Sequence, residues 1–142
     1  MPKVQADGLP LPQRYGAILT IVIGISMAVL DGAIANVALP TIATDLHATP
    51  ASSIWVVNAY QIASVISLLS FSFLGDMFGY RRIYKCGLVV FLLSSLFCAL
   101  SDSLQMLTLA RVIQGFGGAA LMSVNTALIR LIYPQRFLGR GM

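Results

Sequence analysis

Four long apolar stretches alternate with short polar segments along the chain, at about residues 15–39, 51–74, 83–100 and 104–132. A membrane hydrocarbon core about 30 Å thick takes about 20 helical residues to cross, so each stretch is long enough to span it. Backbone in lipid must satisfy its own hydrogen bonds, which a helix does and a loop does not. The pattern therefore predicts an all-α membrane protein with four transmembrane helices.

The ends of these stretches carry residues that start and stop helices. The first stretch is expected to end at Pro40, and Thr49-Pro50 supplies an N-cap and a first-turn proline for the second. Residues 101–103 cap the fourth stretch, which ends near Pro134. The expected organisation is an N-terminal segment, a four-helix membrane region and a tail in which a fifth helix would begin: residues 1–14, 15–132 and 133–142.

Charge and composition add an orientation to this picture. The chain is 58% hydrophobic and only 10% charged, with a net charge of +4. Apart from Arg111, its bases form three clusters: before the first stretch, around the junction of the second and third, and around the end of the fourth. Because cytoplasmic loops carry the excess of Lys and Arg, both termini are expected on the cytoplasmic side. The clusters form no continuous basic face, which argues against a nucleic-acid partner.

The sequence holds no arrangement typical of an enzyme or a metal site. Cys86 and Cys98 are twelve residues apart, a spacing that suits neither a metal site nor a short disulfide framework, and His47 stands alone. No phosphate-binding loop, nucleophile elbow or pair of carboxylates is present. We therefore expect no catalysis, no metal and no bound cofactor.

A signal peptide is an alternative interpretation of the first stretch. Residues 18–30 would be its apolar core, and Ala-Ile-Ala at 33–35 would be its cleavage site. The apolar run continues through Leu39, however, and Asp31 is unusual at that place. Both features favour a spanning helix.

Two charged residues lie inside apolar stretches and far from their ends, Asp31 in the first and Arg111 in the fourth. Asp31 precedes Pro40 by nine residues, or about 13 Å along a helix. Arg111 follows Ser103 by eight residues, or about 12 Å, and the two helices run in opposite directions. The opposite charges thus reach one depth, where they form a static ion pair or a site at which the acid gains and loses a proton beside the arginine.

Neutral polar and small residues also recur at membrane depth. The polar candidates for a substrate cavity are Asn36, Asn58, Gln61 and Gln114. Asn58, Gln61 and Ser64 form one helical stripe, which serves either hydrogen bonding between helices or the lining of a cavity. The small residues Gly115, Gly118 and Ala119 are expected to allow close helix packing.

Within the stretch "SFLGDMFGYRR", residues 72–82, the expected cytoplasmic turn between the second and third helices runs from Leu74 to Arg82. Asp76 lies at a helix C-terminus, where the helix dipole disfavours an acid. We expect Arg81, Arg82 or a helix N-terminus from elsewhere to compensate its charge. The residues assigned to this gating turn are Leu74, Gly75, Asp76, Gly79, Arg81 and Arg82.

This stretch resembles the loop signature of the major facilitator superfamily, Gly-x-Leu-x-Asp-Arg/Lys-x-Gly-Arg-Arg/Lys. Four residues match it, whereas Ser72 and Met77 depart from it; the matches are Leu74, Asp76, Gly79 and Arg81. "LDGAIANVALP" (30–40), "WVVNAYQIA" (55–63) and "LARVIQGFGGAA" (109–120) are similar to motifs of the first, second and fourth helices in the 14-helix drug:proton antiporters. The resemblance covers about residues 15–142 and extends to enterobacterial inner-membrane transporters of that branch.

The resemblance implies roles for individual residues. Asp31 and Arg111 would face a central cavity and take part in proton coupling. Asp76 would contact the C-terminal half of the transporter, with Arg81 in the same charge network, and Met77 removes one charge from that network. The proton gradient would supply the energy without a cofactor. The partners would be the lipid bilayer and lipophilic or cationic small molecules, in a bacterial inner membrane.

Such transporters have two six-helix halves, each of two inverted three-helix repeats, and this chain supplies one repeat plus one helix. We therefore expect it to be the first part of an N-terminal six-helix bundle, a fragment of an alternating-access exporter that is inactive without its C-terminal half. Two alternatives remain open. The chain is a complete four-helix homodimeric transporter, like the small multidrug resistance family, or a non-transporting membrane protein that binds a full-length relative.

Overall fold

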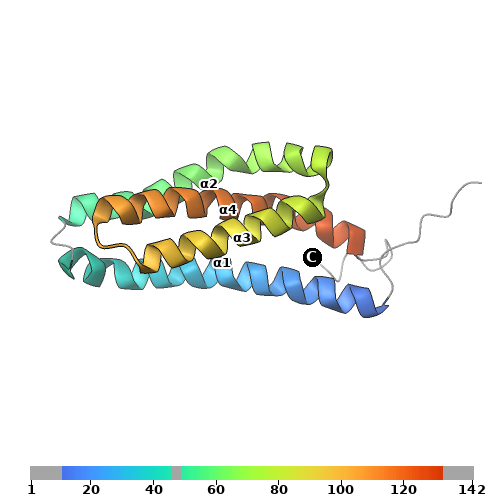
Figure 1. Cartoon of the computed structure of the whole chain (residues 1–142), viewed down its shortest axis with the longest axis horizontal. Coiled ribbons are helices and arrows are strands. Elements are labelled where there is room, and N and C mark those ends of the chain that lie inside the picture. Colours follow the sequence, from blue (N-terminus) through green and yellow to red (C-terminus); the bar gives the residue numbers. More distant parts are fainter. Residues whose placement is uncertain (1–10, 46–48, 133–142) are drawn as a thin grey trace, which may run out of the picture.

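Four antiparallel helices make up the computed structural model, which describes residues 11–45 and 49–132. The helices are α1 (Leu11–Asp45), α2 (Pro50–Phe78), α3 (Tyr80–Ala99) and α4 (Leu104–Ile132). Figure 1 shows successive helices running in opposite directions along one long axis, which is horizontal in this view. All four are long and apolar enough to cross a membrane. The predicted all-α class with four membrane-length helices is therefore confirmed for the described residues.

The helix ends differ from the expected ones in three places. α1 begins at Leu11, four residues before the expected start at about residue 15. α1 continues through Pro40 to Asp45, five residues beyond the expected stop. Proline removes one backbone donor, but membrane helices tolerate that loss because neighbouring groups compensate for it. α2 ends at Phe78 and α3 begins at Tyr80, so a single residue replaces the turn expected over residues 74–82.

That single residue, Gly79, makes the sharp reversal possible. Its φ of +93° lies in the left-handed region that favours glycine. Its backbone N–H donates to the carbonyl of Gly75 at 2.9 Å, and its own carbonyl accepts from the N–H of Arg82 at 3.0 Å. The last turn of α2 and the first turn of α3 are thereby hydrogen-bonded through one glycine.

α4 is the central helix of the bundle. It packs mainly against α2 and α3, whereas α1 makes fewer contacts with the other helices. Within the membrane spans, 56% of α4 is buried, against 17% of α1 and α2 and 22% of α3, so α1 is distinguished from α2 by its fewer contacts. The apolar core includes Phe91 of α3 and Val124 of α4, which are 1% and 0% exposed. α1 is therefore the helix that apolar packing holds least firmly.

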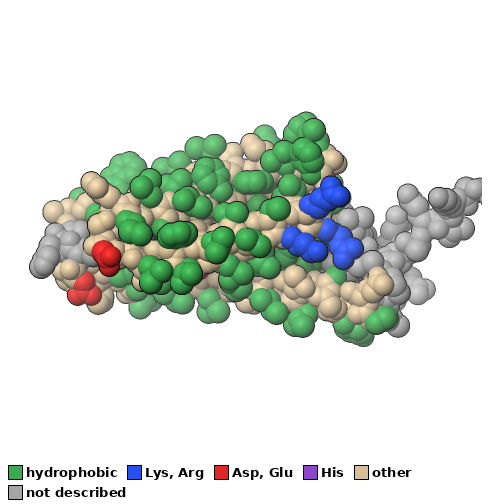
Figure 2. Space-filling view, viewed as in Figure 1, with side chains coloured by type: hydrophobic (Ala, Val, Ile, Leu, Met, Phe, Trp, Pro, Cys, Tyr) green, Lys and Arg blue, Asp and Glu red, His purple; other side chains and the backbone are tan. Residues whose placement is uncertain are grey.

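Charged side chains lie at the two ends of the bundle. Figure 2 shows Lys and Arg gathered at one end and acidic side chains at the other. We call the end at which α2 passes into α3 the basic end, since it carries Arg81, Arg82 and Lys85. The opposite end, with Asp45 and Asp102, is the acidic end. The apolar surface between them is exposed, as expected for helices that face lipid or further helices.

Candidate functional site

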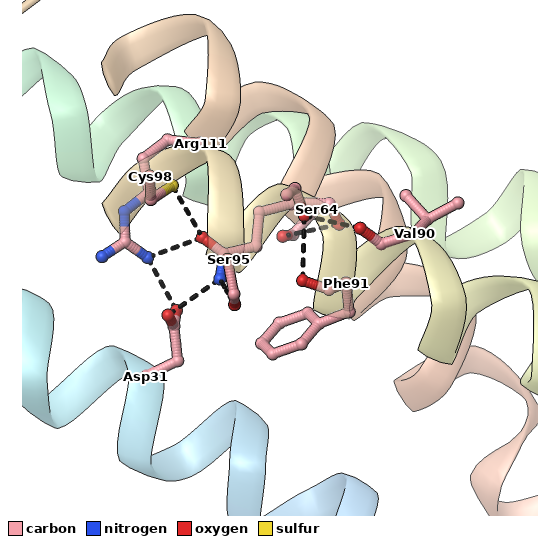
Figure 3. Close-up of polar contacts among 10 residues, drawn as sticks. Asp31, Ser64, Val90, Phe91, Ser95, Cys98 and Arg111 are labelled. Carbon is pink, nitrogen blue, oxygen red and sulfur yellow. Dashed lines mark hydrogen bonds and ion pairs between the residues drawn. The ribbon is translucent and has the colours of Figure 1, made fainter. Parts of the chain in front are cut away.

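An ion pair joins α1 to α4 between the two ends of the bundle. Arg111 Nη1 lies 2.6 Å from Asp31 Oδ2, and the two side chains are 11% and 17% exposed. Figure 3 shows the carboxylate and the guanidinium directed toward each other from facing helices. The two residues therefore meet, as their equal depths along the sequence predicted. The pair is nearly dry, so each charge depends on the other for compensation.

Gln114 completes the contact with Asp31. Its Nε2 donates to Asp31 Oδ1 at 2.8 Å, while its Oε1 accepts from Arg111 Nη1 at 2.9 Å. Arg111 and Gln114 are three residues apart and share one face of α4, so both reach the same carboxylate. Each oxygen of Asp31 thus accepts one hydrogen bond from α4. Gln114 has no exposed surface, so its amide belongs to this network rather than to an open cavity wall.

Two residues of α3, which the sequence analysis did not select, contact the same amide. Gln114 Nε2 donates to Ser95 Oγ at 2.6 Å, and Cys98 Sγ lies 3.6 Å from Gln114 Oε1. Ser95 and Cys98 are three residues apart, which places them on one face of α3. Two polar residues three positions apart on an otherwise apolar helix were the sequence feature that could have identified them. The network therefore spans three helices.

Tyr60 of α2 lies on another side of the arginine. The guanidinium carbon of Arg111 is 5.9 Å from the centroid of the Tyr60 ring, within the range of a cation–π contact. Arg111 Nε is buried and has no hydrogen-bond partner. The positive charge of Arg111 is therefore held by Asp31, by Gln114 and by the face of one aromatic ring.

The remaining cavity candidates lie apart from this network. Asn36 and Gln61 are exposed and Asn58 is half-buried. Ser64, in the same stripe of α2, donates to the carbonyl of Gly115 at 3.1 Å. At Ser64 the stripe therefore provides a hydrogen bond between helices, while Gln61 points outward.

The small residues of α4 bring it close to its neighbours. A Cβ added at Gly115 would lie 2.6 Å from the carbonyl oxygen of Tyr60, and one at Gly118 would lie 2.7 Å from the Tyr60 hydroxyl. Ala119 is fully buried. Gly117, which the sequence analysis did not select, has the same relation to α3, because its Cβ would lie 2.7 Å from the amide nitrogen of Phe91. α4 thus approaches two helices through glycine.

The motif at the α2–α3 junction has a local arrangement of its own. Gly75 is buried and Leu74 half-buried, whereas the other four members are exposed: Asp76, Gly79, Arg81 and Arg82. The hydroxyl of Tyr80 donates to Asp76 Oδ1. Within the described residues no ion pair joins Asp76 to Arg81 or Arg82. The expected local compensation by an arginine is therefore replaced by a tyrosine hydrogen bond.

Within the described part of the chain, no group of three His, Cys, Asp or Glu side chains lies close enough to hold a metal ion. The chemistry available at the α1–α4 site is therefore that of an acid, a base and a neutral amide. Such a site can bind or release a proton at Asp31, and it can exchange the partners of Arg111.

Comparisons with known proteins agree with this picture. The sequence model of the Major Facilitator Superfamily matches residues 21–142. The chain is 99% identical over its whole length to the Escherichia coli (strain K12) protein named "Uncharacterized transporter YebQ", of which it covers 31%. It is 33% identical over 132 residues to the riboflavin transporter RibZ of Clostridioides difficile, covering 93% of this chain and 29% of the relative. It is 34% identical over 135 residues to the multidrug export protein EmrB of Haemophilus influenzae, which covers 92% of this chain and 26% of the relative.

The chain thus spans less than a third of the length of these relatives. The family match favours the transporter interpretation over a small multidrug resistance protein or a non-transporting binding protein. The four membrane-length helices agree with a multi-pass membrane protein. Together, the match over residues 21–142 and the helical fold establish that the chain belongs to the Major Facilitator Superfamily.

Proposed function

We propose that the chain forms the first four helices of a longer proton-coupled exporter that works by alternating access, with Asp31 as the residue that carries the proton. The observation that carries this proposal is the ion pair between Asp31 and Arg111, 2.6 Å apart inside membrane-spanning helices. Ionisable residues at such depth are costly in lipid, and where they occur they commonly mark the pathway of a substrate or an ion. The names of the relatives, which include a multidrug export protein, support export as the direction.

The charge balance of the site favours exchange of a proton for a cation. With Asp31 ionised, the pair has a net charge of zero, and a cation near the carboxylate meets no net repulsion. With Asp31 protonated, the charge of Arg111 remains alone in a site of low dielectric. A bound cation and a bound proton therefore compete, which is the requirement for an antiporter. Lipophilic cations are accordingly the proposed substrates, and the proton gradient supplies the energy.

The packing of α1 supports a conformational response to the proton. α1 makes fewer contacts with the other helices than they make with α4, so the network at Asp31 is a large part of its attachment. Protonation turns the charge-assisted hydrogen bond from Gln114 into a neutral one, which is roughly half as strong, and it removes the attraction between opposite charges from the contact with Arg111. α1 is then freer to move against α4. The remaining polar candidates, Asn36, Asn58 and Gln61, would face substrate in a cavity completed by further helices.

The gating turn is proposed to act at the other end of the same cycle. Asp76 is exposed and forms its described hydrogen bond within the junction, through Oδ1 to Tyr80. It would contact a helix of the C-terminal half and stabilise the outward-open state, with Arg81 in the same network. Both termini and the basic end would lie in the cytoplasm, because Lys and Arg gather there. The membrane would be the bacterial inner membrane.

The test uses inside-out membrane vesicles that contain the full-length E. coli relative. A pH-sensitive dye reports the proton gradient, and added substrate that exchanges for protons dissipates it. Ethidium is the lipophilic cation, and riboflavin is the neutral probe suggested by the name of the C. difficile relative. Asp31→Asn at the matching position should abolish the exchange while leaving expression intact, and Asp45→Asn, at an exposed acid outside both the ion pair and the gating turn, provides the comparison.

Normal proton-coupled exchange by the Asp31→Asn variant would remove Asp31 from the mechanism. Exchange with riboflavin but not with ethidium would keep the coupling and exclude the cationic substrate class. The 142 residues expressed alone should give no proton-driven efflux, because the second half of the cavity is missing from them. Proton-driven efflux by this chain alone would contradict its role as part of a longer transporter.

A further inference from the structure

Tyr80 links the first residue of α3 to the last turn of α2. Its hydroxyl donates to Asp76 Oδ1 across the single-residue junction at Gly79. A carboxylate has no proton to give, so the hydroxyl is the donor and the direction of this hydrogen bond is fixed. The loop signature has its first arginine at the position of Tyr80. A neutral donor therefore stands where the pattern has a charged one.

The ring of Tyr80 is held by the core of the bundle. It packs against the apolar cluster that includes Tyr84 and Val124. It also lies against Gly75 of α2, where a Cβ would be 2.9 Å from Tyr80 Cδ1 and 3.0 Å from Val124 Cγ1. Gly75 is buried, so a side chain at this position would press on the ring. Because the ring is fixed, the hydroxyl reaches Asp76 from a fixed position.

The arginines that follow Tyr80 have a different arrangement. In the part of the chain that the structure describes, no ion pair joins Arg81 or Arg82 to Asp76. Arg81 instead lines two cavities that it shares with Ala17 of α1. The last turn of α2, which the structure describes in full, carries no basic residue. The described hydrogen bond to the Asp76 side chain therefore comes from Tyr80.

We propose that Tyr80 is a positioning residue of the gating turn, which holds the carboxylate of Asp76 in place for its contact with the C-terminal half. This inference rests on the proposed role of Asp76 as the acid that stabilises the outward-open state. Tyr80 occupies Oδ1 and leaves Oδ2 without a partner among the described residues. Because the phenol is neutral, the carboxylate keeps its charge, which the dipole of α2 disfavours at this end. A helix N-terminus, which attracts an acid, is the partner that relieves this cost.

Thiol labelling measures the outward-open state without substrate. The full-length E. coli relative, freed of other cysteines, carries Asn36→Cys at the matching position, which is exposed on α1 and lies on the acidic-end side of Asp31. A membrane-impermeant maleimide is added to right-side-out vesicles, and the labelling rate is compared with that of the denatured protein. Loss of one hydrogen bond of about 1 kcal/mol shifts an equilibrium about fivefold. Tyr80→Phe, which keeps the ring and removes the hydroxyl, should lower the ratio of outward-open to inward-open protein by that factor.

Three further variants show whether Tyr80 acts through Asp76. Asp76→Asn should lower the ratio at least as much as Tyr80→Phe, because the gating acid is lost. The double variant Asp76→Asn/Tyr80→Phe should be labelled at the rate of Asp76→Asn alone, since Tyr80 then has no carboxylate to position. Tyr15→Phe removes a hydroxyl from an exposed tyrosine near the start of α1 and should leave the rate unchanged. Thermal unfolding of each variant shows that the folded protein is being labelled.

The outcomes distinguish this inference from the proposed function. An unchanged ratio in Tyr80→Phe, together with a lower ratio in Asp76→Asn, overturns the positioning role and leaves the gating role of Asp76 intact. Losses that add in the double variant overturn the positioning role as well, because Tyr80 would then act independently of Asp76. A ratio that Asp76→Asn leaves unchanged overturns both, since the acid would then not stabilise the outward-open state.

Discussion

Breaking the α1–α4 ion pair from each side in turn should separate its structural contribution from its functional one. We consider Asp31→Asn, Arg111→Gln and the double variant, introduced at the matching positions of the full-length E. coli relative. Each single change leaves a polar side chain, nearly isosteric at position 31 and shorter at position 111, but removes one charge. The double change removes both charges together. The structure predicts that these three variants differ in stability and share one functional defect.

The magnitude follows from the distance and the burial. With Nη1 and Oδ2 2.6 Å apart, the charge centres lie about 4 Å apart, which gives an attraction of about 4 kcal/mol at an effective dielectric constant of about 20. Removing one partner of a buried pair costs about 3–5 kcal/mol because the other charge stays buried and uncompensated. Because the side chains of Arg111 and Asp31 are still 11% and 17% exposed, we expect the loss of stability in each single variant to lie near the lower end of that range. The double variant should recover to within about 1 kcal/mol of the wild type.

Equilibrium unfolding in detergent micelles measures these differences, and the vesicle assay measures exchange in the same preparations. All three variants should lose proton-coupled exchange, including the stable double variant. Asp76→Asn, an exposed acid outside the pair, should change the free energy of unfolding by less than about 0.5 kcal/mol. A double variant that loses the sum of both single losses would refute the reasoning, because the two charges would then not compensate each other in the folded protein.

Three further predictions concern the glycines and the charge of the site. Gly115→Ala should lower the free energy of unfolding by about 1–3 kcal/mol, because the added Cβ would press on the backbone carbonyl of Tyr60. Gly32→Ala, which has open space around it, should be neutral or stabilising in the same unfolding measurement. Gly79→Ala should cost about 1–2 kcal/mol from the positive φ alone, also measured by unfolding, while Gly16→Ala in open space should not. Acidification should weaken the binding of ethidium more than tenfold in equilibrium binding measurements and leave the binding of a neutral analogue unchanged. Once Asp31 is protonated, the uncompensated charge of Arg111, about 6 Å from a bound cation, repels that cation by about 3 kcal/mol at a dielectric constant of about 20.

The spans were predictable from the sequence because apolar length alone decides whether a helix crosses a membrane. The end of α1 was not, since Pro40 is a strong stop signal in water and a weak one in lipid. The count from Pro40 still placed Asp31 at the depth of Arg111. α1 has 35 residues and is therefore about 52 Å long, so its ends extend beyond a core of about 30 Å. Pro40 thus served as a depth marker even though it does not end the helix.

The contribution of α3 to the site could not be predicted by counting depth. Gln114 lies eleven residues after Ser103, about 16 Å along α4, whereas Ser95 lies only five residues before Leu100, about 7 Å along α3. The side chains nevertheless meet, because side chains lean toward the N-terminus of their own helix and these helices are antiparallel. Gln114 leans toward the acidic end and Ser95 toward the basic end. Counting residues along the two backbones does not account for this convergence of the side chains.

Among the described residues, the polar contacts of α1 at Asp31 and at Thr20 differ in kind, and the one at Asp31 responds to a proton there. At the basic end, the Tyr84 hydroxyl donates to the carbonyl of Thr20 at 3.0 Å, and the ring lies against Gly24, which leaves room for it. Both partners of that contact are neutral. Asp31 lies eleven residues beyond Thr20, about 16 Å along the helix, so the two contacts are far enough apart to act independently. In the proposed cycle, protonation therefore weakens the contact near the middle of α1 and preserves the one near the basic end, which makes α1 tilt about Thr20 rather than separate from the bundle.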